Sequence, residues 1–315
     1  MRIALLNSGL GLLAAAAHLH TLVPGADLVL AMDPDGMPWG ARTPDDIAQR
    51  SLTCARAAAA YEPDVLVFAC NTGSVHALGA LRAEFEPAIP VVGTVPAIKP
   101  AAAASDVIAI WATAATTGSA YQRQLITEFA AAARVAEVAC PGLADAIHAG
   151  DGAATRATVS IAATRTPAGC GAIVLGCTEY ELAADLIGNA LPGAALFGSA
   201  AAVAAQALRR VVPANGAGHG HGTVFAHATP PGFSSAQSSH SRDHASAARD
   251  PGTGRLYVLL SGRPASIPAA ALCYPEGRVL AAMPAGPPLP GARRSGAPQP
   301  VSSSPDDQAG PDIQP

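Results

Sequence analysis

Two cysteines follow apolar runs and precede short polar side chains. Cys70 lies in V-L-V-F-A-C-N-T-G (residues 65–73) and Cys177 lies in A-I-V-L-G-C-T-E-Y (residues 172–180). A thiol acts as a base or nucleophile only as thiolate, and a position where a strand leads into a helix N-terminus lowers the thiol pKa. One such cysteine is most often a small buried hydrophobic residue. The repeated context favours a functional pair.

The residues beside the cysteines are able to hold a carboxylate. Asn71, Thr72 and Thr178 carry neutral donors, which bind a carboxylate without forming an ion pair with a thiolate. A cofactor-free racemase needs two bases on opposite faces of one carbon, because one removes the α-proton while the other delivers a proton from behind. We therefore interpret Cys70 and Cys177 as such a pair.

Strands alternate with helices along the first two thirds of the chain. Strands are expected at residues 2–6, 27–32, 64–70, 107–112 and 172–177, and helices follow them, one of which has Thr43 as N-cap and ends near Tyr61. This alternation predicts parallel sheets with crossover helices, and the second half repeats the first. The predicted fold is α/β, with two pseudo-symmetric lobes, each a mostly parallel sheet flanked by helices, and an active site in the cleft between them.

The sequence also predicts where the two lobes begin and end and which segments lie outside them. The first lobe is predicted at residues 1–97, with 196–212 and 255–282 packing back on it, and the second at residues 98–195. Residues 213–254 and 283–315 are rich in Gly, Ser, Pro and other small or polar residues without periodicity, which predicts a disordered insertion and a disordered tail.

Charge and residue counts exclude several classes. The net charge of -4, without a basic run, argues against nucleic-acid and membrane-surface partners, and no apolar run reaches the ~18 residues of a membrane span. The six cysteines are too sparse for a disulfide scaffold, so a reducing cytoplasm is expected. Asn7 interrupts the apolar N-terminus, which argues against a secretory signal. The only lysine, Lys99, lies between two prolines, so pyridoxal phosphate is not expected.

Five motifs occur in a familiar order and spacing. They are N-S-G (7–9), P-W-G (38–40), A-C-N-T (69–72), T-A-A-T-T-G-S-A-Y (113–121) and G-C-T-E-Y (176–180). Together they resemble the aspartate/glutamate racemase superfamily, most of all its glutamate racemases, over residues 1–212 and 255–272. The resemblance implies an isomerase without metal or pyridoxal phosphate that interconverts L- and D-glutamate, with the D-form serving peptidoglycan synthesis.

The resemblance also implies residue roles. Cys70 would exchange the α-proton of the D-enantiomer and Cys177 that of the L-enantiomer. The residues that would line the substrate are Asn7, Ser8, Trp39, Gly40, Asn71, Thr72, Thr113, Thr116, Thr178 and Glu179. The only partner this implies is a small-molecule amino acid, and a homodimer is compatible with it.

Three residues depart from the usual family pattern. Asn7 replaces an aspartate and is unable to take a proton, Trp39 replaces a tyrosine, and Glu179 replaces a histidine. A carboxylate beside Cys177 is expected to raise the pKa of that thiol. Two alternatives therefore stay open: a racemase of the same superfamily acting on aspartate or another acid, and a catalytically silent paralogue that binds an amino acid.

Other candidate residues have simpler interpretations. Cys54, Cys140 and Cys170 are expected to be core or surface thiols. His219, His221 and His227 lie in the unpatterned segment and are expected to bind metal only adventitiously. The N-S-G-L-G turn lacks the G-x-G-x-x-G spacing of a dinucleotide site.

Overall fold

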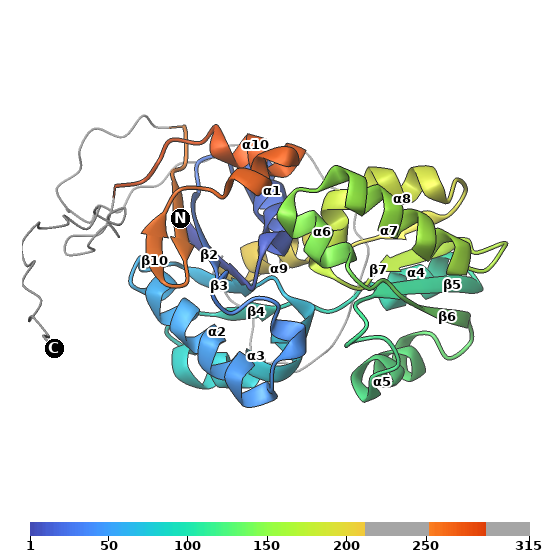
Figure 1. Ribbon diagram of the computed structural model, residues 1–315. Helices are drawn as coiled ribbons and strands as arrows, with labels where there is room; N and C mark the ends of the chain where they lie inside the picture. Colours follow the sequence, from blue (N-terminus) through green and yellow to red (C-terminus); the bar gives the residue numbers. More distant parts are fainter. Residues whose placement is uncertain (212–251, 288–315) are drawn as a thin grey trace, which may run out of the picture.

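The computed structural model describes residues 1–211 and 252–287, which form two lobes side by side (Figure 1). The first lobe contains β1 (Arg2–Asn7), η1 (Leu10–Leu12), α1 (Leu13–Leu22), β2 (Asp27–Met32), η2 (Trp39–Ala41), α2 (Pro44–Ala59), β3 (Val65–Phe68), α3 (Asn71–Phe85), β4 (Val91–Gly93), α9 (Ala200–Val211), β9 (Leu256–Leu260), β10 (Arg263–Ala265), η4 (Ala269–Cys273) and α10 (Pro275–Ala281). Its sheet has the order β10-β9-β2-β1-β3-β4, and every neighbouring pair except β10 and β9 is parallel.

The second lobe is smaller and has the same design. It contains α4 (Ile98–Ala104), β5 (Val107–Ala112), α5 (Ala120–Phe129), β6 (Arg134–Ala139), α6 (Leu143–Ala149), α7 (Gly152–Arg165), β7 (Ala172–Leu175), η3 (Thr178–Ala183), α8 (Ala184–Ala190) and β8 (Ala195–Phe197). Its sheet has the order β6-β5-β7-β8 and is wholly parallel. The predicted α/β fold with two mostly parallel sheets is confirmed.

Alternation along the strands divides the core into layers. In β1, Ile3 and Leu5 face one side of the sheet, while Ala4 and Leu6 face the other. The layer of Ile3 and Leu5 continues into the second lobe, where Trp111 belongs to the same hydrophobic cluster. This shared layer holds the two lobes against each other, and so fixes the distance between their strand ends.

The helix start predicted at Thr43 is confirmed. The Thr43 hydroxyl accepts a hydrogen bond from the Asp46 N–H (3.3 Å), and Pro44 occupies the first helical position. The helix predicted to open in residues 113–122 is α5, which begins at Ala120 with Ser119 as its cap, and residues 113–118 before it form a turn.

The C-terminal region adds two strands to the first sheet. The pattern of residues 255–272 predicts one strand, a turn and a short helix; β9 is the predicted strand, and β10 is an additional strand after the turn. β9 extends the first sheet beside β2. Met283, assigned to the tail, is buried, and Ala285 pairs with Leu256. Residues 213–251 of the predicted insertion, including His219, His221 and His227, and residues 288–315 of the predicted tail lie outside the described residues.

None of the helices within residues 1–211 and 252–287 combines the length and the apolar character needed to cross a bilayer.

Candidate active site

A cavity of about 340 Å³ opens at the carboxyl ends of the strands, with walls from both lobes. This is where open parallel sheets bind ligands. Its lining includes all the predicted site residues except Asn7, namely Ser8, Trp39, Gly40, Cys70, Asn71, Thr72, Thr113, Thr116, Cys177, Thr178 and Glu179. The two cysteines, from β3 and β7, thus open onto one cavity.

Cys70 caps the N-terminus of α3, where its Sγ accepts a hydrogen bond from the Gly73 N–H at 3.4 Å. Burial, and to a smaller extent the carboxylate of Glu179, nevertheless raise the pKa of this thiol to about 12. The backbone N–H groups of Gly73, Ser8 and Thr72 act in the opposite direction but do not outweigh burial. The expected lowering of the Cys70 pKa is therefore wrong.

Cys177 donates a hydrogen bond from its Sγ to Glu179 Oε2 at 2.9 Å. Burial, the negative charge of Glu179 and this hydrogen bond hold the thiol pKa well above its usual value, and Cys70 adds to the effect. The predicted influence of Glu179 is confirmed, while the predicted lowering at a helix N-terminus is wrong here too. With their pKa values raised, both cysteines are thiols at neutral pH.

Two asparagines connect the lobes beside the thiols. The Asn71 amide donates to the Gly176 carbonyl at 2.8 Å, and the Asn7 amide donates to the Ala69 carbonyl and to Thr178 Oγ1 (3.1 Å). Asn7 is fully buried and lies behind the cavity wall instead of lining it. Asn7 therefore links β1 to Thr178, the residue that follows Cys177.

The segment after β1 has no room for a side chain at Gly9 or at Gly11. A Cβ atom added to Gly11 would lie 2.3 Å from Thr178 Oγ1 and 2.9 Å from the Glu179 carboxyl carbon. A Cβ atom added to Gly9 would lie 2.7 Å from His148 Nδ1. Residues of the second lobe therefore rest directly on the backbone of this segment.

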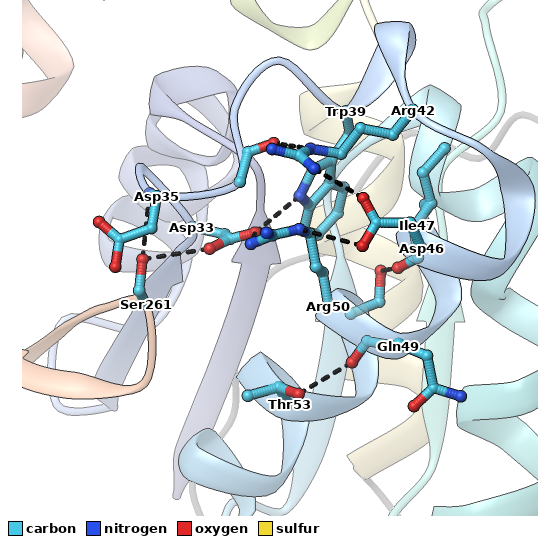
Figure 2. A network of polar contacts seen from close by, with 12 residues as sticks. Asp33, Asp35, Trp39, Arg42, Asp46, Ile47, Gln49, Arg50, Thr53 and Ser261 are labelled. Atoms are coloured by element: carbon cyan, nitrogen blue, oxygen red, sulfur yellow. Dashed lines mark hydrogen bonds and ion pairs between the residues drawn. The ribbon is translucent and has the colours of Figure 1, made fainter.

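Trp39 is held in the cavity wall by a polar network (Figure 2). Its indole N–H donates to Asp33 Oδ2 at 2.9 Å, and the same oxygen pairs with Arg50 at 3.2 Å. Ser261, from the turn between β9 and β10, donates to Asp33 Oδ1 at 3.1 Å. The buried Asp33 thereby joins the C-terminal hairpin, α2 and the loop that carries Trp39, which also contacts Phe68 edge to face.

The opposite wall comes from the turn after β5. The hydroxyl groups of Thr113 and Thr116 lie 3.1 Å apart, and the Thr116 N–H donates to the Thr113 carbonyl. A Cβ atom on Gly40 would lie 3.7 Å from the Cβ of Ala115, so the two walls come into contact distance there.

Sequence reasoning missed the part of the lining that follows β6. This part includes Cys140, Asp145 and His148. Cys140, expected to be a core or surface thiol, is buried and also lines the cavity. The signal was available, because Asp145 and His148 are spaced i, i+3 and therefore lie on one face of the helix after Cys140.

No group of three or more His, Cys, Asp or Glu side chains is placed to hold a metal ion within residues 1–211 and 252–287.

Known proteins resemble this chain over the same region. Residues 10–207 match the family model described as Asp/Glu/Hydantoin racemase. The chain is 36% identical over 218 residues to the glutamate racemase of Pseudomonas putida (strain W619), which covers 67% of this chain and 82% of that protein. It is 35% identical over 219 residues to the glutamate racemase of Roseiflexus sp. (strain RS-1), and this match covers 68% of this chain and 80% of that protein.

A solved structure shares the fold. The glutamate racemase of Escherichia coli, in complex with L-glutamate and the activator UDP-MurNAc-Ala, superposes with a TM-score of 0.63 at 27% identity, covering 67% of this chain and 82% of that one. The two lobes with mostly parallel sheets, shared with this solved structure, and the match to the family model place the chain among the racemases. The chain belongs to the Asp/Glu/Hydantoin racemase family.

Proposed function

We propose that this protein is a racemase that interconverts L- and D-glutamate without a cofactor, with Cys70 and Cys177 as its two bases. The observation that carries the proposal is that thiols from β3 and β7 open onto one cavity between the lobes. The D-glutamate would serve peptidoglycan synthesis, and hence cell-wall formation and cell shape.

In the L-to-D direction, Cys177 acts as the base and Cys70 as the acid. Cys177 must first lose its proton, and the carboxylate of Glu179 is already its hydrogen-bond acceptor at 2.9 Å. The Cys177 thiolate then takes the α-proton, and the Cys70 thiol gives its own proton to the opposite face of the carbanion. The D-to-L direction reverses the two roles.

Because both thiol pKa values are raised, we expect a thiolate to form only when a bound substrate stabilises it. Burial and the nearby Glu179 make a thiolate costly at both cysteines. The α-ammonium group of a bound amino acid brings a positive charge next to the sulfur atoms, which favours the thiolate. Binding and activation of the base are thereby coupled.

Two further parts of the proposal concern the protein as a whole. The cytoplasm is the proposed compartment, because both bases must stay reduced and all cysteines described in the structure are free thiols. The homodimer compatible with the sequence stays a prediction, which light scattering of the purified protein tests.

The experiment is conversion of pure enantiomers, followed by chiral chromatography. The reduced protein is incubated with L-glutamate, and separately with L-aspartate. Formation of D-glutamate alone supports the proposal. Formation of D-aspartate alone would reassign the substrate within the family, and no conversion of either acid by folded protein would favour the silent paralogue.

A further inference from the structure

The proposed substrate brings negative charge into a cavity that already holds two carboxylates. Asp145 and Glu179 line it, and no lysine or arginine does so among residues 1–211 and 252–287. His148 is the lining side chain there that is able to become a cation. A dicarboxylic amino acid has a net negative charge, and burying it beside like charges is unfavourable unless a positive charge is supplied.

His148 is placed to supply that charge. It lies on α6 of the second lobe, half-buried, and its imidazole rests on the backbone of Gly9 from the first lobe. Its Nδ1 atom is buried and has no hydrogen-bond partner. A buried polar atom without a partner is uncommon and costs free energy, which indicates a partner that arrives with the ligand.

Burial and the nearby carboxylates have opposite effects on the pKa of His148. Burial lowers the pKa of the imidazole, and the carboxylates of Glu179 and Asp145 raise it by a smaller amount, so the ring is neutral at pH 7 and above. The other titratable groups on the elements packed against α6 are Tyr180 and Glu181 on η3, Asp151, Arg156 and Arg165 on α7, and Cys273 with Tyr274 at η4. None of these is a cause of the shift at His148.

We propose that His148 takes up a proton from solvent when the acidic amino acid enters the cleft, and that its imidazolium binds a substrate carboxylate alongside Glu179. This inference rests on the proposed function and extends it. His148 does not exchange the α-proton, which stays with the two thiols. The proton leaves again with the product.

Proton uptake gives the substrate affinity a pH dependence. An added carboxylate raises the pKa of His148 in the complex above its value in the empty site. Between these two pKa values, binding consumes a proton, so KM rises as the pH increases. We therefore expect the KM of the unaltered protein for both enantiomers to increase between pH 7 and pH 8.5.

The test compares His148→Gln with His76→Gln, which removes an exposed imidazole from α3. Racemisation kinetics give KM and kcat, and titration calorimetry with DL-glutamate in phosphate and in Tris gives the protons taken up. We expect His148→Gln to raise KM about 10- to 100-fold, the range for loss of one charged hydrogen bond, with kcat within about threefold and no proton uptake. His76→Gln should match the unaltered protein.

Two results would overturn the inference. One is an unchanged KM and unchanged proton uptake in His148→Gln. The other is a flat KM from pH 7 to pH 8.5 in the unaltered protein. This second result needs no variant, so it applies even if His148→Gln fails to fold. Failure of the proposed function is recognised separately, because the unaltered protein would then not racemise glutamate at all.

Discussion

The two thiols share one task, so loss of either should stop it. Cys70→Ser and Cys177→Ser each replace a thiol by a hydroxyl group of nearly the same size that is a far weaker acid. We expect each variant to lose about 100- to 10,000-fold in kcat in both directions, the usual contribution of a positioned acid or base. Chiral chromatography measures this. Cys54→Ser changes a buried thiol that does not line the cavity, so it is the matched control and should keep its kcat.

Glu179 controls the proton of Cys177. Its negative charge raises the thiol pKa, so Glu179→Gln should lower that pKa and increase the thiolate fraction at a given pH. The expected result is that alkylation of Cys177 by iodoacetamide begins at lower pH than in the unaltered protein, as followed by peptide mass spectrometry. The exposed Glu128→Gln is the control. An unchanged or higher onset in Glu179→Gln would contradict this account of the Cys177 pKa.

At the scale of elements, Asp33 joins the loop of Trp39 to α2 and to the hairpin of β9 and β10 (Figure 2). Asp33→Asn weakens the contact with Arg50 and turns one acceptor into a donor beside the Trp39 indole. We expect a loss of about 1–3 kcal/mol in the free energy of unfolding, as for a buried hydrogen-bond partner, together with a raised KM.

Denaturant unfolding and racemisation kinetics measure these two effects. The control is Asp35→Asn on the same loop, whose exposed ion pair with Arg263 should contribute little. Equal effects of the two substitutions would show that the network in Figure 2 does not hold the wall.

The elements that sequence predicted well have buried apolar runs. β2 and β5 lie within the predicted residues because all but the first residue of each is buried. β6 was missed because it is an edge strand with exposed Arg134 and Glu137, and so has no apolar run. Missing β6 hid the helix that carries His148. The cavity residues at the ends of β3 and β7 were found because both motifs follow predicted strands.

The predicted lowering of the thiol pKa values was also wrong, because these values depend on the tertiary structure. Sequence places Cys70 at a helix start, but burial dominates its pKa, and the hydrophobic cluster that contains Cys70 gathers residues from Ala4 to Leu259. Helix position is local and readable from sequence, whereas burial depends on the whole chain.

At the scale of the whole molecule, the C-terminal hairpin is part of the first lobe. β9 pairs with β2 over five residues, and Leu256, Val258 and Leu259 are buried. We expect a chain that ends at Pro287 to keep its melting temperature and activity, and a chain that ends at Val211 to lose both, because the latter uncovers β2. Calorimetric melting of the two truncated chains checks this. Loss of stability in the longer chain would contradict the expectation that the fold needs no residue after Pro287.

The most direct test of the two-base racemase is to start the reaction in D2O and analyse both enantiomers during the first few per cent of conversion. The thiol that removes the α-proton keeps that proton, while the opposite thiol delivers a deuteron taken from solvent. The account predicts that D-glutamate formed from L-glutamate carries deuterium at Cα while the remaining L-glutamate does not, and the reverse when D-glutamate is the substrate. Deuterium in the remaining substrate at the same early time, or product that retains the original proton, would contradict it.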